Sequence, residues 1–135
     1  MRRAAVRQRY ANKTYEAERE YWAGIPVEHP ARRQVTVAEA QEVVDRHAPG
    51  WAVVRGRGFG SGHCNPRDSR ITIGGMACLW LVLHELAHAT TPAGEPMGHD
   101  RPFRARYSAL VRAEVGAAEA DGLLAAFAGL GLAVD

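Results

Sequence analysis

The chain has 135 residues and a mass of 14.7 kDa, so we expect a single domain over residues 1–135. Hydrophobic residues make up 47% of the chain and charged residues 24%, which is typical of a globular protein. The net charge is +2, and the sequence shows no signal peptide and no apolar stretch of membrane-spanning length, so we expect a cytoplasmic protein without membrane contact. The two cysteines, Cys64 and Cys78, are too few for a disulfide framework, and we expect both to be buried small hydrophobic residues.

The first third of the chain predicts two helices. An amphipathic helix runs from about Ala4 to Trp22, with Val6, Tyr10, Ala17 and Tyr21 on its apolar face, and a connector continues to residue 33. A second helix begins with a capping box, in which Thr36 is the N-cap and Glu39 the third helical residue, and ends near residue 48.

A short sheet follows in the middle of the chain. The segment Trp51 to Arg55 reads as a strand, and the alternation in Arg70 to Ile73 predicts a second, half-buried strand. Residues 56–67 are rich in glycine and predict a loop or an irregular hairpin. Because the second strand directly precedes the next helix, we expect it to pair with an extended substrate backbone.

Three helices complete the chain. The first is predicted from about Met76 to Thr90, with an apolar run before its polar end. After a loop with turn-forming residues, an amphipathic helix is predicted over Pro102 to Val115. The last helix, about Ala117 to Leu130, is rich in alanine and leucine and is expected to pack through small residues.

The polar end of the third helix carries the sequence H-E-x-x-H, residues His84 to His88. Residues four apart lie on one face of a helix, so His84 and His88 can bind one Zn²⁺ ion, with Glu85 beside it as the general base for metal-activated water. Three titratable groups at the end of an apolar helix are costly to bury unless a metal compensates them.

A catalytic zinc site needs a third ligand, and three residues compete for that position. His99 is our choice, because it follows His88 by eleven residues and the loop between them contains the turn formers that reverse the chain. Asp100 and Glu114 are alternative ligands. Asp100 also has two other uses: it can accept the free N–H of a ligating histidine, or it can cap the helix that starts near residue 102.

Two further residues are candidates for the site. Tyr107 is a possible donor to the oxyanion of a tetrahedral intermediate, although its helical spacing from Phe103 and Val111 favours a core position. His63 could line the active-site cleft, and solvent exposure is the competing interpretation.

The motif and its surroundings resemble a known family. The segment Leu81 to Ala89, LVLHELAHA, followed by Gly98 to Phe103, GHDRPF, is similar to the zincin domains of SprT-like proteins, closest to a group of actinobacterial and phage-borne metallohydrolases. The resemblance covers about residues 51–111 as a zincin-like core, preceded by the N-terminal helix and connector of residues 1–33. It implies a minimal zincin fold, in which a short sheet packs on the H-E-x-x-H helix among additional helices, with a catalytic Glu85 and three zinc-binding histidines, His84, His88 and His99.

The function we expect is a zinc-dependent metallopeptidase acting on a peptide or protein substrate. The chain has no cysteine after Cys78 and so lacks the zinc ribbon of many SprT-like proteins, which argues against a DNA–protein-crosslink protease. The alternative function is a binding or structural module stapled by the metal, associated with nucleic acid or a phage particle and without hydrolytic activity. A nucleic-acid partner would use the basic residues of the first third: Arg2, Arg3, Arg7, Arg9, Lys13, Arg19, Arg32 and Arg33.

Overall fold

The computed structural model describes residues 2–95 and 98–133, and within those ranges it describes side chains from residue 13 onward. These residues form five α-helices, one short 3-10 helix and a three-stranded sheet, which confirms the predicted α+β class. The chain groups into two compact units: Val27–Glu95, the central unit, and Met1–Pro26 with Pro96–Asp135, the terminal unit. The minimal zincin fold and the single domain stay predictions.

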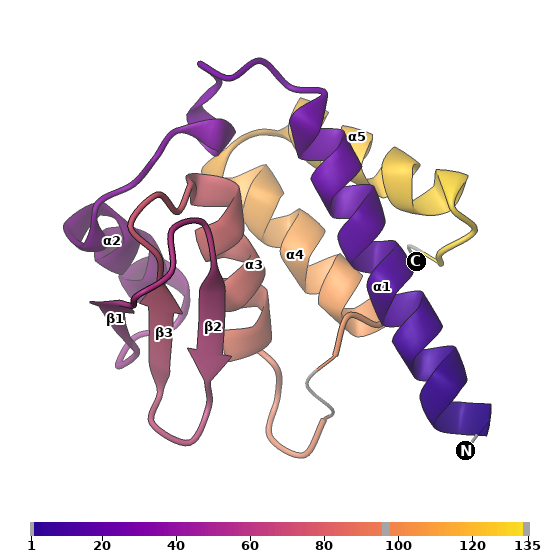
Figure 1. The fold of residues 1–135 in the computed structure, drawn as a ribbon, viewed down its shortest axis with the longest axis horizontal. Coiled ribbons are helices and arrows are strands. Elements are labelled where there is room, and N and C mark those ends of the chain that lie inside the picture. Colours follow the sequence, from indigo (N-terminus) through magenta and orange to yellow (C-terminus); the bar gives the residue numbers. More distant parts are fainter. Residues whose placement is uncertain (1, 96–97, 134–135) are drawn as a thin grey trace. The chain divides into compact units, whose positions relative to one another are not determined.

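The central unit is built on a mixed sheet of three short strands (Figure 1). The strands are β1 (Ala52–Arg55), β2 (Gly62–Asn65) and β3 (Arg70–Ile73), arranged in the order β1-β3-β2. β3 lies parallel to β1 and antiparallel to β2. The glycine-rich segment therefore forms an irregular hairpin, one of the two predicted outcomes, and β2 is its first strand.

Helix α2 (Val37–His47) supports the free edge of β1, after the short 3-10 helix η1 (Pro30–Arg32). It begins with the predicted capping box, because Thr36 Oγ1 accepts from the Glu39 N–H and Glu39 Oε1 accepts from the Thr36 N–H. From this helix the Gln41 side chain donates to the Trp51 carbonyl and accepts from the Val53 N–H, each at 2.8 Å. The Gln41 amide thus satisfies backbone groups at the outer edge of β1.

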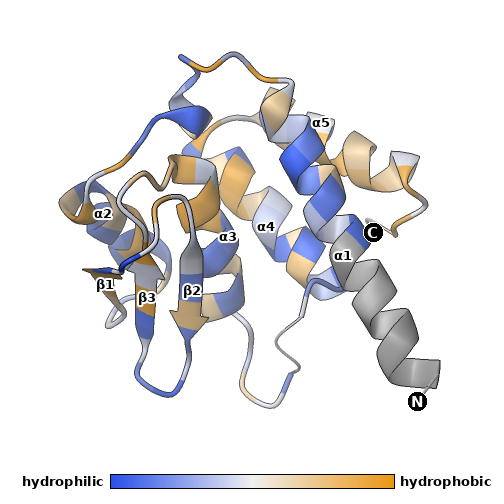
Figure 2. Ribbon diagram, viewed as in Figure 1, coloured by the Kyte–Doolittle hydropathy of each residue, from blue (hydrophilic) through white to orange (hydrophobic). Residues whose placement is uncertain are grey.

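Helix α3 (Leu79–Ala89) carries the motif and is apolar over its first half, as Figure 2 shows. The predicted start at Met76 is wrong, since the helix begins three residues later and the Met76 side chain is 62% exposed. The reason is a long-range backbone contact: the Gly75 and Met76 N–H groups donate to the carbonyls of Gly58 and Phe59. The backbone before α3 therefore extends the hairpin instead of the helix.

The terminal unit contains helices α1 (Arg2–Ala23), α4 (Arg101–Glu114) and α5 (Ala117–Gly129). Its core is apolar and largely aromatic, and includes the fully buried side chains of Trp22, Phe103, Tyr107, Leu123 and Phe127. The predicted small-residue packing of the last helix is confirmed at Gly122, where an added Cβ would lie 2.6 Å from the Tyr21 hydroxyl. No helix in the described residues is both long and apolar enough to cross a membrane.

The apolar face predicted for the first helix and the two cysteines were expected to be buried. Ala17 is buried as predicted, whereas Val6 and Tyr10 lie outside the residues whose side chains are described. The two cysteines, which were expected to be buried, are less buried than expected, because Cys64 on β2 and Cys78 at the N-cap of α3 are both half-buried.

Candidate metal centre

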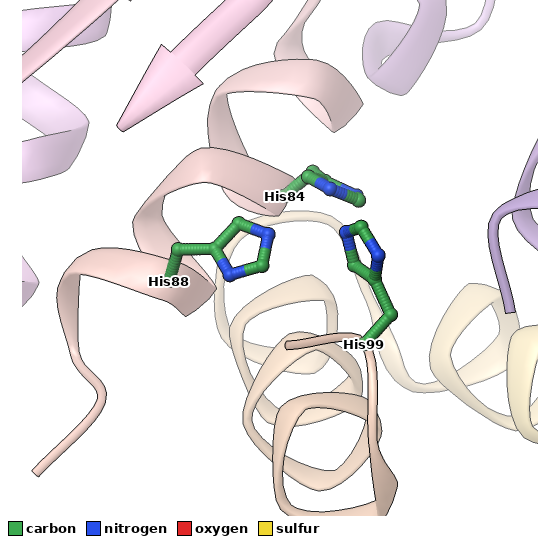
Figure 3. A group of neighbouring side chains, drawn as sticks. All are labelled: His84, His88 and His99. Atoms are coloured by element: carbon green, nitrogen blue, oxygen red, sulfur yellow. The ribbon is translucent and has the colours of Figure 1, made fainter. Parts of the chain in front are cut away.

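Helix α3 presents two imidazoles on one face. His84 and His88 are one helical turn apart, and their ring centroids lie 5.1 Å apart with the planes at 71°. Figure 3 shows both side chains leaving α3 on the same side. The apolar residues before them place this end of the helix in the interior, so that His84 is only 5% exposed and His88 is half-buried.

Glu85 lies between the two histidines in sequence and is 6% exposed. Its side chain lies against the backbone of β2. A Cβ built on Gly62 would lie 2.9 Å from Glu85 Cγ and 3.0 Å from Glu85 Oε2. The carboxylate therefore occupies the space that any other residue type at position 62 would fill.

The thiol of Cys64 lies on the same side of β2 as Gly62, since residues two apart in a strand share a face. Burial and the negative charge of Glu85 raise the pKa of Cys64 to about 12. A thiol with this pKa stays protonated at neutral pH, and only the thiolate binds metals or acts as a nucleophile. Cys64 is thus a neutral neighbour of the carboxylate.

His99 lies two residues before Arg101, the first residue of helix α4. Its ring contacts Phe103 edge-on, with centroids 4.9 Å apart and planes at 81°. The next residue, Asp100, is the N-cap of α4, and its Oδ1 accepts from the Phe103 N–H at 3.1 Å. This confirms the helix-capping use of Asp100.

The three histidines predicted as ligands could hold a metal ion. Each of His84, His88 and His99 offers one ring nitrogen, and these nitrogens lie within 4.8 Å of one another (Figure 3). Three neutral imidazoles are a donor set that suits Zn²⁺, which at Zn–N distances of 2.0–2.1 Å places tetrahedral ligands about 3.4 Å apart. The donor set does not fix the identity of the metal.

Comparison with protein-family models, with curated proteins and with solved structures gave no match. The SprT-like resemblance therefore remains a prediction from the motif and its surroundings.

The two alternative ligands do not belong to the histidine group. Among the described residues, only the three histidines come together in this way, and neither Asp100 nor Glu114 is part of the group. Glu114 is the last residue of α4, whereas His99 precedes its first residue. With a rise of 1.5 Å per residue, the length of the helix separates them by about 20 Å.

Of the two remaining candidates, Tyr107 is buried in the core and His63 is exposed to solvent. Tyr107 is fully buried, and its hydroxyl accepts a hydrogen bond from Trp22 Nε1 at 2.9 Å, which confirms the core position. Its ring stacks on that of Phe103 at 5.8 Å. His63 is exposed on β2, and the alternation of the strand directs it away from the face of Gly62.

The expectation that the strand Arg70–Ile73 pairs with a substrate is wrong. This strand, β3, is central, and both of its edges are occupied, by β1 and by β2. Among the described residues, β2 is the edge strand beside Glu85, and the sequence placed it in a loop or irregular hairpin because it contains few strand-forming residues.

The sequence motifs did not point to Thr14 and Arg104, which contact the backbone of His99. A signal was present for each. Arg104 falls on the buried face of an amphipathic helix, where a charged residue requires partners, and Thr14 falls on the predicted inner face of α1 between Tyr10 and Ala17.

Proposed function

We propose that the protein is a zinc-dependent metallohydrolase that cleaves peptide bonds, with Glu85 as its general base. The observation that carries this proposal is the burial of a glutamate between two imidazoles on one helix, in a position that β2 leaves open for it with a glycine. A carboxylate buried at such a position, beside two imidazoles on one helix, favours a functional explanation.

The metal would be held by His84, His88 and His99. The ten residues between His88 and His99 are sufficient to bring the third imidazole to the other two, and the nitrogen distances support this set. Bound zinc supplies Lewis acidity and makes water acidic enough to be deprotonated near neutral pH.

Glu85 would perform the proton transfers. Its carboxylate accepts the proton of the attacking water, holds it, and donates it to the nitrogen of the leaving amine. Because the side chain is 6% exposed and fits against Gly62, it has few other positions to adopt. A fixed orientation reduces the entropy lost on reaching the transition state.

The outer edge of β2 would bind the substrate backbone. The Gly74 N–H donates to the Ser61 carbonyl, so the alternation of an antiparallel pair directs the backbone groups of His63 toward β3. The same alternation directs the N–H and C=O groups of Gly62 and Cys64 outward, next to Glu85. No strand in the described residues pairs with this edge, and Gln41 already occupies the opposite edge of the sheet. An extended peptide is the ligand that fits such an edge.

The test compares the zinc-loaded protein with the Glu85→Gln variant on unfolded casein, with peptide release measured by mass spectrometry. We expect Glu85→Gln to lose at least about a hundredfold in rate while zinc content and unfolding midpoint stay unchanged. His63→Ala, which removes an exposed histidine from the other face of β2, is the control and should cleave like the wild type. If the wild type and Glu85→Gln bind the same amount of zinc and the wild type releases no peptides, the result would instead support the metal-stapled module.

A further inference from the structure

The main-chain carbonyl of His99 accepts two hydrogen bonds within the terminal unit. Thr14 Oγ1 donates to it at 2.9 Å from helix α1, and a terminal nitrogen of Arg104 donates to it at 3.1 Å from helix α4. The same Arg104 nitrogen donates to Thr14 Oγ1 at 3.1 Å. The three groups therefore form a closed triangle of hydrogen bonds.

Each group of this triangle is hydrogen-bonded to both of the others. The Thr14 hydroxyl donates its one proton to the carbonyl and accepts from the guanidinium, and the carbonyl accepts with both lone pairs. Thr14 is fully buried and Arg104 is 5% exposed, so neither group can exchange these partners for water at low cost. Arg104 Nε also donates to the Ala133 carbonyl at 3.0 Å, which fixes the guanidinium from a second side.

The helix itself does not hold this carbonyl. The first intrahelical bond of α4 runs from the Arg104 N–H to the Asp100 carbonyl, and the Phe103 N–H is taken by the Asp100 side chain. The carbonyl of His99 is thus outside the helical ladder, and Thr14 and Arg104 are the groups that fix it.

We infer that Thr14 and Arg104 are positioning residues that set the backbone of His99 so that its imidazole is oriented for the metal. The inference rests on the proposed function, because it takes His99 as a ligand. Two contacts add to the orientation: the hydrogen bond from the Phe103 N–H to the Asp100 side chain fixes the residue after His99, and the Phe103 ring lies against the imidazole. Groups that orient metal ligands contribute strongly to metal affinity although they do not touch the ion.

The N-terminal helix then has a role in positioning the third imidazole. The family resemblance covers only residues 51–111, and Thr14 lies well before it, 85 positions from the histidine that it contacts. Helix α1 then helps to position a metal ligand. The hydroxyl of Thr14 is required for this as specifically as the guanidinium of Arg104.

The experiment measures zinc affinity by competition with a chromophoric chelator for the full chain and two substitutions at Thr14. Thr14→Val keeps the shape of the side chain and removes the hydroxyl, and we expect it to weaken zinc binding by roughly 10- to 100-fold. Thr14→Ser retains the hydroxyl and should restore affinity to near the wild-type value. Ser108→Ala is the matched control and should not change zinc affinity. Ser108 is a buried hydroxyl residue like Thr14, but it lies on α4 and donates only to the Ala105 carbonyl.

The visible absorption of the cobalt-loaded protein provides a second readout that a purely structural role would not change. We expect Thr14→Val and Arg104→Lys to alter the cobalt spectrum, and Thr14→Ser and Ser108→Ala to preserve it. If Thr14→Val binds zinc as tightly as the wild type, with the same cobalt spectrum, the inference is wrong while the proposed function stands. A wild type that binds no zinc would overturn both.

Discussion

Glu85 Oε2 lies so close to the backbone of Gly62 that a Cβ at position 62 would be 3.0 Å from it. This contact places the carboxylate of Glu85, on helix α3, next to β2 and the outward-facing backbone groups of that strand. It also explains why β2 carries a glycine in its first position, where a strand-forming residue would otherwise be favoured.

The contact predicts that Gly62→Ala impairs hydrolysis without removing the metal. The added methyl group displaces the carboxylate of Glu85, and misplacement of a catalytic group by about 1 Å can cost on the order of a hundredfold in rate. Cleavage rate and zinc content of the purified variant check this. The matched control is Gly60→Ala, since a Cβ there meets no atom within 4 Å. If Gly62→Ala cleaves as fast as Gly60→Ala, the carboxylate is not the group that limits the rate.

The raised pKa of Cys64 predicts an unreactive thiol. With its pKa at about 12 instead of the ordinary 9.0, the thiolate fraction at pH 8 is lower by roughly a thousandfold, and alkylation by iodoacetamide slows in proportion. Reactivity should therefore rise with pH up to about pH 12.

The alkylation rate of the Cys64 thiol also depends on the charge of Glu85. Glu85→Gln removes a negative charge that raises the pKa of Cys64, so this variant should alkylate faster at Cys64, although burial keeps the thiol slower than a free one. Cys78, whose pKa is raised by burial without a contribution from Glu85, is the internal control. Peptide mapping by mass spectrometry separates the two sites, and an unchanged rate at Cys64 would mean that the carboxylate lies elsewhere in solution.

Substitutions of Asp100 distinguish a helix-capping role of this residue from a metal-binding role. Asparagine caps helices about as well as aspartate, whereas alanine does not, so Asp100→Ala should lower the free energy of unfolding by about 1 kcal/mol and Asp100→Asn should not. Chemical denaturation measures both. Zinc content should be close to that of the wild type in Asp100→Asn. A loss of zinc in that variant, with stability retained, would make Asp100 a ligand.

Local features of this fold could be predicted from the sequence because they depend on neighbouring residues. The spacing of His84 and His88 places them on one helical face in any helix, and the box of Thr36 and Glu39 is complete within four residues. The N-cap role of Asp100 could also be predicted locally, because Pro102 follows it in the first turn of the helix.

Features that depend on distant segments could not be predicted in this way. Helix α3 starts later than predicted because the backbone of Gly75 and Met76 is hydrogen-bonded to residues in the preceding loop. The strand order places β3 in the centre of the sheet, which the sequence of a single strand does not reveal. The contact of Thr14 with His99 joins two segments 85 positions apart, so the spacing of residues in α1 places Thr14 on an inner face but does not identify its partner.

The most direct test of the zinc hydrolase is the amount of metal bound per chain. Elemental mass spectrometry on the wild type, His99→Ala, Glu85→Gln and the control His63→Ala should find about one zinc per chain in the wild type, Glu85→Gln and His63→Ala, and much less in His99→Ala. No zinc on the wild type after incubation with zinc, or undiminished zinc on His99→Ala, would contradict the three-histidine site on which the proposed function depends.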